Sequence, residues 1–325
     1  MTVDLDLRPY EPTDEEAVVA LLAASSRWMS DDQHRAYFVW KHTSNPFGKS
    51  PAWVATDGDR VVGLRTFLRW EFVQDGRITR AVRAVDTATH PDHQGRGLFT
   101  RLTRHALDEL AGDGVAFVFN TPNERSRPGY LKMGWEIVGR LPVVARPRSP
   151  AVLVRLARAR VKASRWPEST GAGVPAARAL ADRPAVEALL ADLPPADGLA
   201  THRTATYLSW RYGFAPLGYR VVTAPAGPAE GMVVFRLRRR GAALEATVCE
   251  ELVPGCDPRL TSHLLARALR ESGADHAVRL GGRPPRAGFL PVPGQGPTLA
   301  FRAVRQRVAP PAAHWRLGLG DVELM

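Results

Sequence analysis

The chain has 325 residues, of which 45% are hydrophobic and 24% are charged, a balance that is typical of globular proteins and excludes a fibrous or disordered chain. A domain usually has about 150 residues, so this length predicts two domains. The formal net charge of +11 favours an anionic partner such as a nucleotide, a nucleic acid or a phosphorylated metabolite. Either a functional surface or a general preference for arginine explains this charge, because 40 of the 44 basic residues are arginine.

The excess of positive charge lies in the second half of the chain. Residues 1–150 carry 20 basic and 19 acidic groups, whereas residues 151–325 carry 24 and 14. No run of residues approaches the roughly 18 apolar residues of a membrane span, and the N-terminus lacks the basic and apolar segments of a secretion signal. The two cysteines, Cys249 and Cys256, follow no metal-binding or disulfide pattern. We therefore expect a cytoplasmic protein without a membrane span or a metal site, and the sequence does not indicate its oligomeric state.

The first half predicts a mixed α/β layout, in which several antiparallel strands precede a helix, a strand and another helix. Alternating apolar residues and glycine turns predict strands, and apolar residues on one face predict helices. The predicted strands are 51–55, 61–65, 67–73, 78–86, 115–119 and 135–138, the predicted helices are 17–22 and 100–111, and 123–132 is predicted as a short helix or turn.

A weak internal repeat connects the two halves. The block Tyr37-x-x-Trp40-Lys41-His42, followed by Pro46, reappears as Tyr207-x-x-Trp210-Arg211-Tyr212, followed by Pro216, at an offset of 170. The helical pattern at 17–22 recurs at 185–190, at an offset of 168. Chance likeness explains two Ala/Leu-rich helices as well as a common design does, but the second block favours a common design.

The repeat predicts a first domain over residues 1–145 and a second over 181–325, joined by a helical and proline-rich linker over 146–180. Within this linker, 152–165 has apolar residues on one side and regularly spaced basic residues on another. This pattern predicts a basic amphipathic helix, whose charged face is either solvated or in contact with an anionic surface.

The turn Gln94-Gly95-Arg96-Gly97 lies between a strand-like run and a predicted helix. Successive backbone amides at a helix start bind anions, and the helix dipole adds partial positive charge. Glycine permits positive φ and close approach of a phosphate. The turn is neither a P-loop, which ends in GK[ST], nor a Rossmann fingerprint, which has a third spaced glycine. By itself, Gly-x-Gly is a weak signal.

The residues around this turn make the signal more specific. The run Thr89-His90-Pro91-Asp92-His93-Gln94-Gly95-Arg96-Gly97-Leu98-Phe99 resembles motif A of the GNAT superfamily of acyl-CoA-dependent N-acyltransferases, with Phe99 where Gly or Ala is usual. Further along, Asn123, Ser126, Tyr130, Gly134 and Trp135 are similar to a second pattern of that superfamily, with Ser for Ala and Trp for Phe. The resemblance covers roughly residues 1–145.

This resemblance implies a fold of two GNAT-like domains, each a mixed, mostly antiparallel sheet flanked by helices. It also implies acetyl-CoA as the acyl donor. The strand before the turn would carry a bulge and part from its parallel neighbour, so that pantetheine lies between them. The residues implied in donor binding are Thr87, Ala88, Thr89, Gln94, Gly95, Arg96, Gly97, Leu98, Phe99, Asn123 and Ser126.

The implied chemistry is attack of a neutral amine on the thioester, with backbone amides stabilising the oxyanion and Tyr130 protonating the leaving thiolate. Asp86 and His90 are the candidates for the base. Each has a structural alternative, because Asp86 fits a buried structural carboxylate, His90 fits a loop contact, and Tyr130 fits a core aromatic. Tyr37 and Trp40 either pack in the core or line an acceptor pocket.

The second copy is expected to be degenerate. Pro254-Gly255-Cys256-Asp257-Pro258 replaces the Gln-x-x-Gly turn, and Pro284 occupies the position that matches Tyr130. This copy would help to shape an acceptor site without binding the donor.

Three functional hypotheses remain open from the sequence. The first is an acetyl-CoA-dependent N-acetyltransferase that acts on a small-molecule amine. The second is a Fem-type peptidyltransferase that uses aminoacyl-tRNA, which the basic half favours and the intact turn does not, so that nucleic acid is not the expected partner. The third is a non-catalytic acyl-CoA-binding module, which would keep the turn and tolerate the loss of Tyr130.

Overall fold

The structure is a computed structural model that describes residues 5–25, 28–149, 152, 161–281, 288–306 and 308–323. Pro284 and most of the predicted basic helix, residues 153–160, lie outside the described residues. Residues 161–165 of that prediction have no helical structure. The chain forms two compact units, one made of residues 1–139 and 298–314, and the other of residues 140–297 and 315–325.

The first unit is a mixed sheet with strand order β1-β2-β3-β4-β5-β15-β6. Strands β4 and β5 are parallel, whereas β1–β2, β2–β3, β3–β4 and β5–β15 are antiparallel pairs. The strands are β1 (Asp6–Pro9), β2 (Ala52–Asp57), β3 (Arg60–Gln74), β4 (Arg77–Thr89), β5 (Phe117–Asn120), β6 (Glu136–Arg140) and β15 (Thr298–Ala303).

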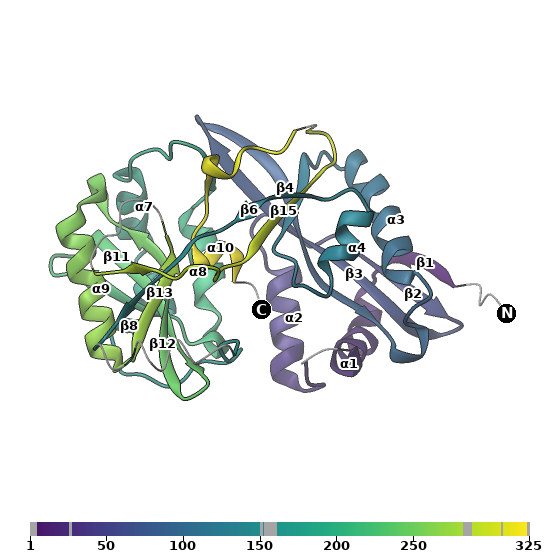
Figure 1. The fold of residues 1–325 in the computed structure, drawn as a ribbon, viewed down its shortest axis with the longest axis horizontal. Coiled ribbons are helices and arrows are strands. Elements are labelled where there is room, and N and C mark those ends of the chain that lie inside the picture. The colour runs from purple at the N-terminus through teal and green to yellow at the C-terminus, as the bar shows by residue number, and fades with distance from the viewer. Residues whose placement is uncertain are drawn as a thin grey trace. The chain divides into compact units, whose positions relative to one another are not determined.

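Helices cover both faces of this sheet. Figure 1 shows α1 and α2 on one face and α3 and α4 on the other. Leu98, Leu102, Ala106 and Leu110 of α3 are buried in the main core, because their spacing puts them on one face of the helix. The helices are α1 (Glu15–Ser25), α2 (Asp32–Thr43), α3 (Leu98–Gly112) and α4 (Arg127–Lys132), with short 3-10 turns η1 (Pro12–Asp14) and η2 (Pro91–His93).

The second unit is another mixed sheet, with strand order β14-β7-β13-β12-β11-β10-β8. Its one parallel pair in this order is β12–β13, and helix α9 packs apolar residues such as Leu264 and Leu265 into its core. The mixed α/β fold predicted for both halves is therefore confirmed. The elements are β7 (Val143–Pro147), β8 (Val174–Pro175), α6 (Ala176–Ala179), α7 (Arg183–Ala191), β9 (Leu199–Thr201), α8 (Ala205–Gly213), η3 (Ala215–Leu217), β10 (Arg220–Ala224), β11 (Gly227–Arg240), β12 (Ala243–Leu252), η4 (Pro254–Cys256), α9 (Pro258–Ser272), β13 (His276–Leu280), β14 (Leu290–Pro291), η5 (Ala312–His314, in the first unit), β16 (Trp315–Arg316) and α10 (Leu319–Val322).

The boundaries of the units differ from the predicted ranges in the placement of two strands. Strand β15, from the end of the chain, lies between β5 and β6 in the first sheet. Strand β7, which follows β6 directly, belongs to the second sheet and pairs with β13. Each sheet therefore contains a strand from a distant part of the chain. Local sequence patterns carry no signal for such long-range pairing, because a strand has the same alternation whichever sheet it joins.

Several arginines of the second unit form ion pairs with buried carboxylates. Arg203 binds both Glu250 (2.8 Å) and Asp321 (3.0 Å). Arg238 pairs with Glu245 at 3.1 Å and also with Glu323. Each such pair removes one positive and one negative charge from the surface, so these pairs leave the net positive charge of the second half unchanged.

Within the described residues, no helix is long and apolar enough to span a membrane. In the same part of the chain, no group of three or more His, Cys, Asp and Glu side chains is arranged to hold a metal ion.

The C-terminal helix α10 generates a prediction about stability. A Cβ atom at Gly320 would overlap the Tyr212 hydroxyl and lie 3.1 Å from the Cys249 carbonyl oxygen, and that hydroxyl donates a 2.7 Å hydrogen bond to Glu250. Gly320→Ala should therefore lower the free energy of unfolding by roughly 1–3 kcal/mol, through overpacking and a lost buried hydrogen bond. Urea unfolding measures this loss. Gly213→Ala, where a Cβ meets no neighbour within 4 Å, is the control, and an equal effect of the two variants would contradict the packing.

Candidate functional site

A β-bulge interrupts the pairing of β3 and β4. Leu64 pairs with Ala88 and Thr66 pairs with Val85, so Arg65 faces two residues, Asp86 and Thr87. Asp86 has a φ of +35°, which is uncommon for a residue other than glycine. The extra residue in β4 bends the strand and disrupts the ladder locally. The bulge expected from the family resemblance is present at this position.

Beyond the bulge, β4 separates from its parallel neighbour. The two strands pair only between Ala81–Arg83 and Phe117–Phe119, and β5 ends at Asn120 while β4 continues to Thr89. Thr87, Ala88 and Thr89 therefore lie on a stretch of β4 that β5 does not cover. Unpaired backbone at such an edge is available to hydrogen-bond a ligand.

The Asp86 carboxylate anchors the bulge from the side of α2. Its Oδ2 lies 2.6 Å from Lys41 Nζ and 2.8 Å from His42 Nε2, and both partners are buried. Burial alone would raise the pKa of Asp86, but the Lys41 ammonium and the His42 hydrogen bond outweigh it and hold this pKa well below its ordinary value. Burial lowers the pKa of His42 against the opposing effect of Asp86, and its Nδ1 lies 2.9 Å from Ser50 Oγ.

The backbone amides of residues 95–99, which we call the amide turn, lie at the N-terminal end of α3. Gly95 and Gly97 have φ of +75° and +72°, a conformation that glycine adopts at no steric cost. Gly97 is the N-cap of α3 without a side-chain cap. No acceptor in the described part of the chain is hydrogen bonded to these five amides. With the positive end of the helix dipole behind them, they form a site suited to an anion.

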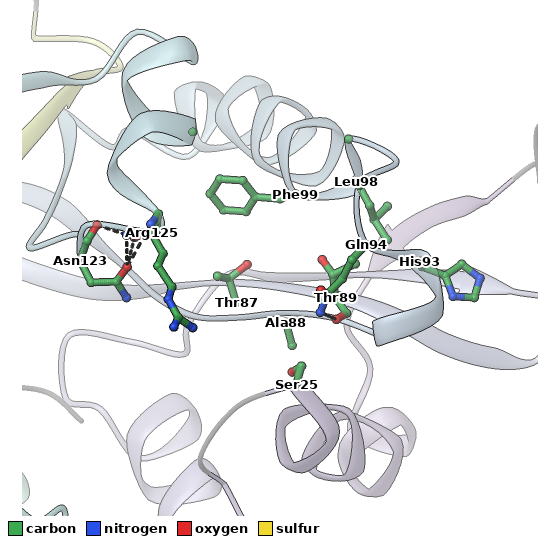
Figure 2. A pocket seen from close by; sticks show the side chains of 14 residues that line it. Ser25, Thr87, Ala88, Thr89, His93, Gln94, Leu98, Phe99, Asn123 and Arg125 are labelled. Atoms are coloured by element: carbon green, nitrogen blue, oxygen red, sulfur yellow. Dashed lines mark hydrogen bonds between the residues drawn. The ribbon is translucent and has the colours of Figure 1, made fainter.

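The amide turn and the open edge of β4 share one cavity of about 400 Å³. Figure 2 shows Thr87, Ala88 and Thr89 along the strand, with Gln94, Leu98 and Phe99 beside them. The lining residues are Ser25, Thr87, Ala88, Thr89, His93, Gln94, Gly95, Gly97, Leu98, Phe99, Asn123, Arg125, Ser126 and Gly129. Ten of the eleven residues predicted to bind the donor are among them, and only Arg96, which is exposed, is not.

Asn123 forms the wall of the cavity before α4. Its Oδ1 accepts hydrogen bonds from the backbone N–H groups of Arg125 and Ser126, both at 3.0 Å (Figure 2). Its Nδ2 has no acceptor within the described residues, so this amide group is available as a donor. Gln94 is fixed in turn by a 3.2 Å hydrogen bond from its Nε2 to the Thr89 carbonyl oxygen.

Four lining residues were not predicted from the sequence: Ser25, His93, Arg125 and Gly129. Arg125 and Gly129 lie inside the second motif, so their position was a usable signal. Figure 2 shows Arg125 extending toward the strand that carries Thr87. Ser25 comes from the end of α1, 64 residues before the first motif begins at Thr89, and no local pattern indicates its role.

Phe99 stands where the family usually has Gly or Ala, and Gly129 makes room for it. A Cβ at Gly129 would lie 3.1 Å from Phe99 Cε1. The Phe99 ring also meets the Tyr130 ring edge to face, with centroids 5.3 Å apart. Tyr130 is buried behind Phe99 and does not itself line the cavity, and its hydroxyl oxygen accepts a 3.0 Å hydrogen bond from Arg65 Nη1.

The remaining predicted site residues lie outside the cavity lining. His90 Nε2 is 2.6 Å from Arg60 Nη2, and His90 Nδ1 accepts from the Asp92 N–H at 3.3 Å. Tyr37 and Trp40 are buried, and their rings lie 5.5 Å apart in a cluster with Trp28. Their predicted role in binding an acceptor stays a prediction.

Comparison with known proteins identifies the first unit. Residues 6–138 match the family model described as an acetyltransferase (GNAT) domain. This segment is a GNAT domain. The match covers the bulge, the amide turn and both motifs, so these features belong to a domain of the acetyltransferase type. Comparison with curated protein sequences finds no match.

Solved structures share the fold at low sequence identity. A probable N-acyltransferase of Enterococcus faecalis V583 is 12% identical with a TM-score of 0.64, covering 93% of this chain and 73% of that chain. A GCN5-related N-acetyltransferase of Kribbella flavida is 17% identical with a TM-score of 0.61, covering 93% and 71%. Eis1 of Mycobacterium abscessus is 18% identical with a TM-score of 0.57, covering 92% and 73%.

The buried position of Asp86 in the GNAT domain predicts a pH-dependent contribution to stability. Because its pKa is lowered in the folded state, this contribution is complete above the unfolded value of about 3.9 and is lost as the pH falls below it toward the folded value. Asp86→Asn should lower the free energy of unfolding by roughly 3 kcal/mol at pH 7, since it leaves Lys41 buried without its counter-charge.

Denaturant unfolding at pH 7 and at pH 3 measures this dependence, and the gap between wild type and Asp86→Asn should narrow at the lower pH. Asp108→Asn, at an exposed position of α3, serves as the control. A gap that is the same at both pH values would show that Asp86 does not act as a charged partner of Lys41.

Proposed function

We propose that the protein is an N-acetyltransferase that transfers an acetyl group from acetyl-CoA to the amine of a small molecule. The observation that carries the proposal is the shared cavity, in which the amide turn meets the uncovered edge of β4. An anion-binding turn beside free strand backbone suits a long donor that has a pyrophosphate at one end and amide groups along its arm. The sequence-based expectation of a cytoplasmic location stays a prediction.

Donor binding would use each part of this cavity for one part of the molecule. The amides of residues 95–99 would bind the pyrophosphate, because they have no acceptor within the described residues and lie at the positive end of the α3 dipole. The backbone of Thr87–Thr89 would pair with the pantetheine arm. The free Nδ2 of Asn123 would donate a further hydrogen bond to that arm.

The acyl transfer would proceed by direct attack of the amine on the thioester. The amine nitrogen forms a bond to the carbonyl carbon, and a nearby backbone N–H stabilises the oxyanion. The carbon–sulfur bond then breaks, and Tyr130 donates its proton to the sulfur. Tyr130 contacts Phe99, a lining residue, with ring centroids 5.3 Å apart, so it lies one side chain away from the cavity.

The amine also loses a proton, and the surroundings of the two predicted bases differ. His90 Nε2 faces Arg60 and its Nδ1 faces the N–H and the carboxylate of Asp92. These loop contacts and its position outside the cavity lining disfavour it as the base. Asp86 is ionised but held by Lys41, so it is a weak base on its own. The hydrogen-bonded series Asp86–His42–Ser50 favours a relay in which neutral His42 takes the proton at Nδ1 and Asp86 stabilises the imidazolium, as in other Asp–His pairs.

The second unit is proposed to be a degenerate copy of the first. Its strand β12 also carries a bulge, since Val234 pairs with Glu250 and Phe235 with Val248. Glu250 at this bulge binds Tyr212 of α8, as Asp86 binds His42 of α2. Helix α9, however, begins at Pro258, which has no N–H, and the Asp257 carboxylate caps it by accepting from Arg259 N–H at 2.8 Å. That end favours neither a phosphate nor a pyrophosphate.

The donor-binding test described below also distinguishes two alternatives, a different donor and a non-catalytic role. An aminoacyl-tRNA donor is favoured by the basic second half, whose net charge the ion pairs of Arg203 and Arg238 leave unchanged, and is disfavoured by the amide turn, which suits the pyrophosphate of acyl-CoA. A non-catalytic acyl-CoA-binding module would use the same cavity without turnover.

The N-cap of α3 provides a sharp test of donor binding. Gly97→Asp would copy the Asp257 cap of α9, placing a negative charge where the pyrophosphate binds, whereas Gly97→Asn keeps the shape without the charge and tolerates positive φ. Acetyl-CoA at 100 times its Kd should stabilise the wild type by about 2.7 kcal/mol in a thermal-shift assay. Gly97→Asp should weaken binding at least 10-fold more than Gly97→Asn does.

Equal binding by the two variants would exclude the amide turn as the pyrophosphate site. Stabilisation by tRNA but not by acetyl-CoA or CoA would favour the peptidyltransferase alternative. Binding of acetyl-CoA without release of thiol across a panel of amines would favour the non-catalytic alternative.

A further inference from the structure

Arg65 is the one residue of β3 that faces the bulge in β4. Leu64 and Thr66 have partners on β4, and Arg65 lies opposite Asp86 and Thr87. Its side chain is completely buried, with 0% of its surface exposed. It points to the face of the sheet that α3 and α4 cover, because Phe67, Phe99 and Tyr130 surround it.

The contacts of Arg65 do not balance its charge. Its Nη1 donates a 3.0 Å hydrogen bond to Tyr130 Oη, while its Nε and Nη2 have no hydrogen-bond partner. Its guanidinium carbon lies 4.4 Å from the Phe67 ring centroid, 5.4 Å from that of Phe99 and 5.3 Å from that of Tyr130. Within the described residues, no carboxylate forms an ion pair with it.

Such a side chain is costly for the folded protein. Moving an ion into the protein interior costs several kcal/mol even after relaxation, and a cation–π contact returns only about 0.5–2 kcal/mol. The other buried cation beside the bulge, Lys41, has the Asp86 carboxylate 2.6 Å away. Arg65 instead provides a preorganised positive charge, which stabilises negative charge that forms only during a reaction.

Tyr130 is the group through which this charge would act. Its oxygen accepts a hydrogen bond from Arg65, so its own proton must point elsewhere. No acceptor for that proton is present in the part of the chain that the structure describes. The phenol therefore has a fixed oxygen and a proton free for transfer, one ring away from the cavity that Phe99 lines.

We propose that Arg65 is a positioning residue for the departure of the thiol: it holds the Tyr130 hydroxyl toward the donor sulfur and stabilises the phenolate that proton transfer leaves behind. This inference rests on the proposed function. When the carbon–sulfur bond breaks, its electron pair stays on sulfur, and the proton moves from Tyr130 Oη to sulfur. The phenolate next to Arg65 then recovers a proton from solvent, while the proton lost by the amine leaves on the acceptor side.

A double-mutant cycle separates this role from a structural one. The variants are Arg65→Met, Arg65→Lys, Tyr130→Phe and the double variant Arg65→Met/Tyr130→Phe. Arg69→Met is the matched control, because Arg69 lies on the same strand but pairs at the surface with Asp113 at 2.5 Å. The measurements are thiol release from acetyl-CoA with the best amine of a panel, binding of CoA by thermal shift, and urea unfolding.

Arg65→Met should lower kcat about 10- to 100-fold while leaving the Kd for CoA within 2-fold of the wild type. In the Tyr130→Phe background, the same substitution should change kcat less than 2-fold, since the group it acts through is gone. Arg65→Lys should recover part of the loss. Arg65→Met should unfold at the same or a higher urea concentration than the wild type, because it removes a buried charge without a counter-charge, and Arg69→Met should keep kcat.

Equal losses of kcat from Arg65→Met in the wild-type and Tyr130→Phe backgrounds would overturn the inference, as would a loss of stability that accompanies the loss of activity. Failure of the proposed function has a different signature, in which CoA stabilises neither the wild type nor any variant.

Discussion

The bulge at Asp86 and Thr87 is the constraint on which the site depends. A non-glycine residue at a φ of +35° is strained, and such strain persists only where surrounding contacts over-determine it. Lys41 and His42 provide those contacts by holding the Asp86 carboxylate at 2.6 and 2.8 Å. The bend they maintain directs β4 away from β5, leaves Thr87–Thr89 uncovered and leaves Arg65 facing two residues instead of one. The open edge of β4 that lines the cavity and the position of Arg65 opposite the bulge both follow from this one distortion.

The extent to which the sequence predicts this site depends on how local each feature is. Gly95 and Gly97 signal positive φ and a helix start by themselves, and Asn123 and Tyr130 follow by spacing, so the lining of the cavity was largely predictable. The ion pair between Lys41 and Asp86 joins residues 45 positions apart on a helix and a strand, and no pattern links them. The sequence therefore left Asp86 open between a base and a buried structural carboxylate, and the structure shows its carboxylate bound on two sides.

The fold shows the same limit at a larger scale. Alternation and turn residues predict strands that overlap β2 to β6, although the predicted strands 61–65 and 67–73 are parts of the single strand β3, and β1 was not predicted. The insertion of β15 between β5 and β6 depends on tertiary packing that no window of sequence contains. The role of Arg65 was not predictable from the sequence either. An arginine in a strand is usually exposed, and only the structure shows that this one is buried.

The central claim is that the amides of residues 95–99 hold the donor's pyrophosphate, and amide hydrogen exchange with and without acetyl-CoA tests it most directly. These amides have no acceptor within the described part of the chain, so they should exchange fast in the free protein and slow down when the donor binds. The start of α9, capped by Asp257, should exchange at the same rate with and without the donor. Unchanged exchange at residues 95–99 under saturating acetyl-CoA, or protection at the start of α9 instead, would contradict this account.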